Sequence, residues 1–169
     1  MRALAIRLIV VAASATALNA QQPAGSIDVP EGARVVLTAK GDGVQIYSCS
    51  DSNGGFKWVL KGPDAKLLDA DGKVIGTHFA GPTWQLNDGG LVQGELPVPK
   101  QSPEKGSIPW LKLSAKAGTA SGSLASVAII RRTETHGGVA PASGCQTSAD
   151  AGKTVQVPYT ATYTFYAEK

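Results

Sequence analysis

The sequence TVQVPYTATYTFYA, residues 154–167, decides the fold class of this chain. Apolar or aromatic residues occupy every second position, and mostly Thr and other polar residues lie between them. The apolar set is Val155, Val157, Tyr159, Ala161, Tyr163 and Phe165. A period of two with β-branched and aromatic side chains is typical of a β-strand. We therefore expect the apolar face to lie in the core and the Thr face in solvent. Pro158 cannot donate to a ladder and marks an edge, a bulge or a break.

Seven further segments have the length and composition of strands, and turn signals separate many of them. The segments are 35–39, 43–49, 56–60, 73–79, 83–86, 91–96 and 110–115. The turn signals are GDG at 41–43, NGG at 53–55, DG at 71–72 and DGG at 88–90. Many short strands with regular turns indicate an all-β, single-domain antiparallel sandwich or barrel-like fold with long loops and one disulfide.

The remaining segments are less regular. Residues 123–133, SLASVAIIRRT, fit both a helical face and an alternating strand, and their β-branched content favours a strand. Residues 97–109 are rich in proline, and residues 134–153 are rich in glycine and small residues. We expect both to be long irregular loops, which in compact domains often carry function.

Residues 1–20 have the layout of a signal peptide, which predicts export to the periplasm or the extracellular space. Arg2 and Arg7 precede an apolar stretch from Leu8 to Leu18, which is too short to span a bilayer core of about 30 Å. Cleavage is expected after Ala20, or alternatively after Ala17, and leaves residues 21–169 as a single β-rich domain. We therefore expect a secreted protein without an integral membrane anchor.

The charge balance argues against nucleic acid as a partner. The chain carries 16 basic and 13 acidic residues, and two of the basic ones lie in residues 1–20, so the remainder has a net charge of +1. No dense stripe of Lys and Arg is left to follow a phosphate backbone. The sequence does not indicate an oligomeric state.

Cys49 and Cys145 are the only cysteines of the chain. Because exported compartments oxidise thiols, we expect them to form a disulfide that joins the early part of the domain to its late part. An oxidised pair cannot act as nucleophile or metal ligand. Tyr47 lies two residues before Cys49, on the same side of a strand, and we expect its ring to pack beside the disulfide.

His78, Trp84 and Asp88 form the candidate pocket predicted from the sequence. An imidazole can be a base, an acid or a metal ligand near neutral pH, and a carboxylate such as Asp88 can orient it. The alternative is a packed histidine that is bonded to a loop carbonyl. Trp58, Trp84 and Trp110 either form an aromatic platform for a ligand or pack in the core.

The sequence gives little support for metal or cofactor chemistry. His78 and His136 are weak metal candidates, because a catalytic zinc site needs three protein ligands and a carboxylate such as Asp88 or Glu134 would have to help. No G-x-S-x-G occurs, and Gly41-Asp42-Gly43 is too short for a dinucleotide motif. We expect no cofactor and no metal.

Six runs in order along the chain carry a resemblance to a known family. They are residues 27–37, 43–49, 76–90, 108–113, 133–145 and 157–166. The chain resembles the secreted bacterial and fungal proteins grouped as domain of unknown function 3455. The resemblance implies an exported, mostly β domain whose activity is unestablished. The family pattern is matched here at His78, Gly81, Pro82, Trp84 and Asp88. The Ser of the family's D-G-S is Gly90 here, and His136 falls at a variable position.

Three functions are compatible with these observations. The leading hypothesis is an exported β-domain that binds a small molecule, a glycan or an envelope component near His78, Trp84 and Asp88. The first alternative is a hydrolytic or metal-assisted enzyme that uses His78 and Asp88. The second is a purely structural envelope protein, which needs no pocket.

Overall fold

Eight antiparallel strands close into a barrel in the computed structural model, which describes residues 26–52 and 54–169. The strands are β1 (Arg34–Asp51), β2 (Phe56–Leu68), β3 (Val74–Phe79), β4 (Thr83–Leu86), β5 (Leu91–Lys100), β6 (Trp110–Ala115), β7 (Ile129–Gly137) and β8 (Thr154–Ala167). Two short 3₁₀ turns, η1 (Gly122–Leu124) and η2 (Ser148–Asp150), lie in the connections around β7. The predicted all-β antiparallel fold is confirmed, and of its two forms the barrel is the one formed. The signal peptide predicted at residues 1–20 lies outside the described residues.

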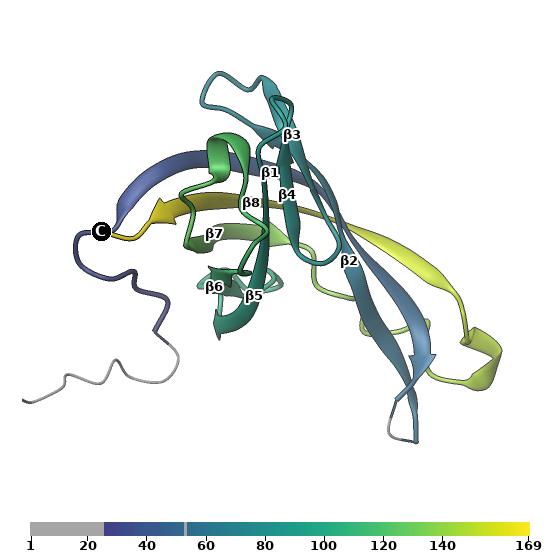
Figure 1. Cartoon of the computed structure of the whole chain (residues 1–169). Helices are drawn as coiled ribbons and strands as arrows, with labels where there is room; N and C mark the ends of the chain where they lie inside the picture. The colour runs from purple at the N-terminus through teal and green to yellow at the C-terminus, as the bar shows by residue number, and fades with distance from the viewer. Residues whose placement is uncertain (1–25, 53) are drawn as a thin grey trace, which may run out of the picture.

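The barrel is a simple meander in which each strand pairs with the next along the chain. Pairing of β1 with β8 closes the sheet, from Arg34 opposite Ala167 to Ser48 opposite Thr154. These two strands are the longest and run side by side across the whole molecule (Figure 1). Closure leaves no free sheet edge along most of their length. No helix of the described residues is long and apolar enough to cross a membrane.

The alternation of β8 is confirmed and supplies much of the barrel core. Tyr159, Ala161, Tyr163 and Phe165 are all buried. The prediction of a solvent-facing Thr side is only partly right, because Thr164 is buried beside Arg131 of β7 in the strand register. Pro158 does not interrupt strand β8, which is continuous from Thr154 to Ala167. It pairs with Val44 of β1 and lies just beyond the end of the β7 ladder, where no neighbouring strand requires its missing N–H.

The predicted turn at Gly41-Asp42-Gly43 is wrong, since these residues lie inside the continuous strand β1. The two glycines are there because the barrel interior leaves no space for side chains. A Cβ at Gly41 would lie 2.5 Å from Cε2 of Tyr163, and one at Gly43 would lie 2.5 Å from the Cα of Ala65 on β2. Glycine inside a strand therefore marks close approach here rather than a turn.

The strand predicted for residues 123–133 is right only in its second half. Strand β7 begins at Ile129, and the preceding residues form η1 and a short connection. Leu124 and Val127 are buried from this connection and pack in the core. Strand β7 also continues to Gly137, so the irregular segment before β8 is shorter than the predicted loop 134–153. Similarly, β5 extends to Lys100 into the predicted loop 97–109.

The predicted disulfide joins Cys49 and Cys145, which are 96 positions apart. It ties the end of β1 to the connection between β7 and β8, at the end of the molecule where the β1–β2 hairpin projects (Figure 1). Trp58 of β2 holds the same connection, because its Nε1 donates to the carbonyl oxygen of Ser143. Tyr47 is buried on the same face of β1 as Cys49, and its hydroxyl donates to the carbonyl oxygen of Gly138.

Candidate functional site

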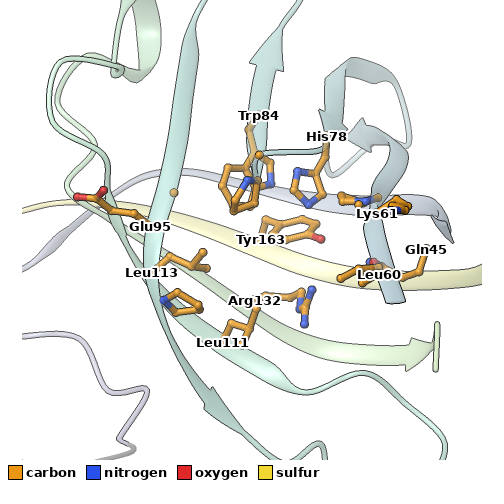
Figure 2. A pocket seen from close by; sticks show the side chains of 16 residues that line it. Gln45, Leu60, Lys61, His78, Trp84, Glu95, Leu111, Leu113, Arg132 and Tyr163 are labelled. Atoms are coloured by element: carbon orange, nitrogen blue, oxygen red, sulfur yellow. The ribbon is translucent and has the colours of Figure 1, made fainter. Parts of the chain in front are cut away.

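The barrel encloses a cavity of about 300 Å³ between its packed core and the surface (Figure 2). Its apolar lining comes from Leu60, Pro63, Pro82, Trp84, Pro97, Leu111 and Leu113. Its polar side chains are those of Gln45, Lys61, His78, Glu95, Arg132 and Tyr163. Leu60 and Pro97 are exposed and mark the mouth, whereas Trp84 and Tyr163 are buried and form the inner wall. A mostly apolar hollow with a few inward polar groups is the usual form of a small-molecule site.

The hairpin of β3 and β4 brings His78 and Trp84 together in this wall. The two residues are directly opposite in the register of the hairpin. Cross-strand partners have Cβ atoms about 5 Å apart, so both side chains reach the same face of the sheet. Gly81, in the turn between the strands, has a φ of +103°, a conformation that side chains disfavour. The sequence GTHFAGPTW therefore contains both the turn at Gly81 and the cross-strand pair of His78 and Trp84.

The imidazole of His78 is fixed in a neutral form. Its Nδ1 lies 2.8 Å from the carbonyl oxygen of Thr83. A carbonyl only accepts, so Nδ1 carries the proton and Nε2 is left as an acceptor. Burial lowers the pKa of His78 to about 3, the Thr83 carbonyl partly opposes this, and the Arg132 charge adds to the lowering. A general base works best with a pKa near the operating pH, so His78 is a hydrogen-bonding group rather than a proton carrier.

Tyr163 continues the wall along β8, and its hydroxyl contacts that of Tyr159, which does not line the cavity. The hydroxyls of Tyr159 and Tyr163 are 3.1 Å apart and both are buried. The ring of Tyr163 meets His78 and Trp84 edge-on, with centroids 4.9 Å and 5.5 Å away. Burial raises the pKa of Tyr163, and the nearby charge of Arg132 acts against that rise. The phenols therefore stay protonated at neutral pH and can donate hydrogen bonds.

The structure separates Asp88 from His78 and Trp84. Asp88 lies in the exposed turn between β4 and β5 and does not line the cavity. Its Oδ1 accepts from the backbone N–H of Gly90, and this bond together with one from the Ser123 side chain holds the pKa of Asp88 below its usual range. Asp88 thus stabilises a turn, and the orienting partner of His78 is a backbone carbonyl.

The second histidine and the other tryptophans lie elsewhere. His136 is exposed on β7 and pairs with the carboxylate of Glu104. Trp84 alone of the three tryptophans lines the cavity, while Trp110 borders two other, more open hollows. The structure therefore does not gather the three rings into one platform. Within residues 26–52 and 54–169, no three His, Cys, Asp or Glu side chains lie close enough to hold a metal ion.

Of the six polar side chains of the cavity, only that of His78 was predicted from the sequence, and Gln45 and Arg132 are among those that were missed. Strand alternation contained the signal for both. Gln45 shares the inward face of β1 with Tyr47 and Cys49, and Arg132 shares the inward face of β7 with Ile130. A polar side chain in an otherwise apolar inward series marks a group that faces a cavity or a buried partner.

The fold and the cavity together define an eight-stranded up-and-down β-barrel with an internal pocket at one mouth. The chain belongs to the family described as protein of unknown function (DUF3455), whose sequence model matches residues 30–167. The resemblance carried by the sequence runs is thereby confirmed. No curated protein matches the chain, and no solved structure does.

Proposed function

We propose that the protein is exported and binds a small organic molecule in the barrel cavity without transforming it. The cavity itself is the observation that carries this proposal. Eight strands give a barrel just wide enough for side chains to fill or for one small ligand. Here side chains fill one part of the interior, and about 300 Å³ beside Trp84 and Tyr163 is left open. That volume is at the lower end of the range for ligand pockets, about 300–1,000 Å³.

The chemistry of the lining favours binding over catalysis. None of the residues around the cavity is a Ser, Thr or Cys, so no hydroxyl or thiol nucleophile of those types faces a ligand. The one imidazole is neutral and weakly basic, with a pKa of about 3. The single carboxylate, Glu95, points away from the rings (Figure 2). These features support a binding protein over the enzyme built on His78 and Asp88.

The disulfide between Cys49 and Cys145 supports export, because such bonds persist in oxidising compartments. A small ligand also fits the site better than a glycan chain. An extended sugar needs an open groove with many paired donors and acceptors, whereas this site is a hollow with an apolar lining. A purely structural role does not require a cavity, so the cavity favours the binding role.

Ligand-induced stabilisation tests the proposal. A compound present at about 100 times its Kd stabilises the folded state by about 2.7 kcal/mol, which raises Tm by about 5 °C or more in a domain of this size. We would screen small aromatic and aliphatic acids, amides and alcohols by thermal shift. Leu111→Trp adds an indole to the cavity wall and should abolish the shift. Val35→Trp makes the same kind of change at an exposed position of β1 outside the cavity and should preserve it.

Loss of the shift in both variants, or in neither, would contradict a site in the barrel. A screen in which no compound stabilises the protein would contradict binding of these classes altogether.

A further inference from the structure

Arg132 places a positive charge inside the barrel wall. It lies on β7 opposite Leu111 of β6 and Tyr163 of β8, and it follows the fully buried Ile130 on the inward face. Figure 2 shows its side chain directed into the cavity, across from His78 and Trp84. Arg132 is half-buried, so its charge is partly removed from water, and a charge in that position favours a paired, hydrogen-bonded state.

No carboxylate of the described residues pairs with Arg132. The ion pairs found in residues 26–52 and 54–169 join His136 to Glu104 and Lys153 to Asp150. Glu95, the one acidic residue of the lining, extends in another direction (Figure 2). The partners of the guanidinium are neutral: the carbonyl oxygen of Pro109 accepts from Nε and Nη2 at 3.1 Å and 2.7 Å, and the hydroxyl of Tyr163 is a second hydrogen-bond partner. A guanidinium has five N–H hydrogens, so those that these two oxygen atoms do not take remain for a ligand.

Two further donors in the lining have no partner within the described part of the chain. They are the amide Nε2 of Gln45 and the indole Nε1 of Trp84. Gln45 is 2% exposed and Trp84 is 1% exposed, so bulk water does not replace the missing acceptors. Buried donors of this kind are rare in folded proteins, since each one left unpaired is destabilising. Both residues border the same cavity as Arg132.

The polar groups of the cavity are therefore strongly biased toward donors. Arg132 has free N–H groups, Gln45 and Trp84 have unpaired N–H groups within the wall, and Nε2 of the neutral His78 imidazole is left as an acceptor. Lys61 adds a second positive charge at the mouth. A ligand that satisfies this set must bring acceptor atoms and negative charge. Its body must be apolar, because leucine, proline and aromatic side chains form the rest of the wall.

We propose that the ligand is a small organic carboxylate, whose acid group binds Arg132 and whose apolar body lies against Trp84, Leu111 and Leu113. The carboxylate accepts from the free edge of the guanidinium, a geometry that arginine is well suited to make with both oxygens. Gln45, whose Nε2 has no acceptor, lies in the same wall. This inference rests on the proposed function, because it specifies the ligand of the same cavity.

Matched acids and amides test the charge requirement directly. We would titrate the full-length protein by calorimetry with 2-naphthoate and 2-naphthamide, and with decanoate and decanamide. Each pair has the same apolar body and differs in charge. We expect the acid to bind about ten- to a hundredfold more tightly than its amide, the range typical of a charge-assisted hydrogen bond in a partly buried site.

Neighbouring arginines of β7 supply the matched variants. Arg132→Gln removes the inward charge and should make each acid no tighter than its amide. Arg131→Gln removes an outward charge, which lies 5.6 Å from the ring centroid of Tyr166, and should leave the preference intact. Circular dichroism establishes that both variants fold. The acid and amide comparison on the unmodified protein needs no variant and decides the question even if Arg132→Gln does not fold.

The outcomes separate this inference from the proposed function. Equal affinity for acid and amide, or a preference that survives Arg132→Gln, overturns the carboxylate while leaving a small-molecule site. Binding of neither member of either pair at millimolar concentration contradicts the carboxylate ligand and the proposed function together.

Discussion

The imidazole of His78 is stacked on the indole of Trp84, with ring centroids 4.4 Å apart and 5° between the ring planes. Offset stacking of this kind adds about 0.5–1.5 kcal/mol beyond the area that the rings bury. The stack closes the inner wall of the cavity and holds the histidine away from water. It therefore links the stability of the barrel to the protonation of one buried side chain.

Acid should destabilise the protein through His78. Its folded-state pKa of about 3 lies below the ordinary value of 6.5, so the unfolded state binds more protons between these values. The stability that His78 contributes is present above about pH 6.5 and is lost as the pH falls toward 3, by up to about 1.4 kcal/mol per pH unit. Urea unfolding between neutral pH and about pH 4 measures this slope.

Two variants isolate the histidine from the carboxylates that also titrate in this range. His78→Gln should show a shallower dependence on pH than the unmodified protein. His136→Gln, which removes an exposed histidine together with its contact to Glu104, should leave the pH dependence that His78 causes in place. Identical slopes for His78→Gln and the unmodified protein would show that His78 is not held neutral by burial.

The glycines inside β1 should tolerate no side chain. A Cβ at Gly43 would overlap the carbonyl oxygen of Asp64 and lie 2.5 Å from the Cα of Ala65, and neither backbone atom can rotate away. We expect Gly43→Ala to lower the free energy of unfolding by about 3 kcal/mol or more. Gly55→Ala, where a Cβ meets nothing within 4 Å, should change it by less than about 0.5 kcal/mol. Similar urea midpoints for the two variants would refute the close packing of β1 against β2.

The disulfide should stabilise the barrel without contributing to the cavity. In the chain-entropy model, a closed loop of 96 residues contributes up to about 4.7 kcal/mol, and measured values for native disulfides are typically 2–5 kcal/mol. The double variant Cys49→Ala, Cys145→Ala should therefore unfold at lower urea concentration while it binds ligand with unchanged affinity, because neither cysteine lines the cavity. Two reactive thiols in the denatured but unreduced protein would rule out the bond.

The alternation of residues within a strand was enough to predict most of the strands. Features that depend on how the barrel closes could not be predicted from it. The inward series of β8 from Tyr159 to Phe165 follows from its sequence, because a period of two needs no knowledge of neighbours. Gly41 and Gly43 resemble a turn locally, and only the approach of Tyr163 and of β2 shows why they lie in a strand.

The same contrast holds for the cavity. His78 and Trp84 could be linked in advance, because one short hairpin joins them. Asp88 follows closely in sequence, yet the next turn carries it to the surface. Arg132 enters the cavity from a strand that lies far along the chain, and its role depends on the register of β6, β7 and β8. Closure of the barrel through the pairing of β1 with β8 brings these residues to one cavity, and the local sequence of a strand does not contain that information.

The indole N–H signals of the three tryptophans give the most direct test of a ligand site in the barrel. Trp84 lines the cavity with an unpartnered Nε1, Trp58 is bonded to Ser143, and Trp110 lies outside the cavity. Each signal in a ¹⁵N-labelled sample is assigned by its Trp→Phe variant, and 2-naphthoate is then added. We predict that the Trp84 signal shifts in a saturable manner while those of Trp58 and Trp110 stay in place. A Trp84 signal that does not move, or shifts confined to Trp58 or Trp110, would contradict binding in the cavity.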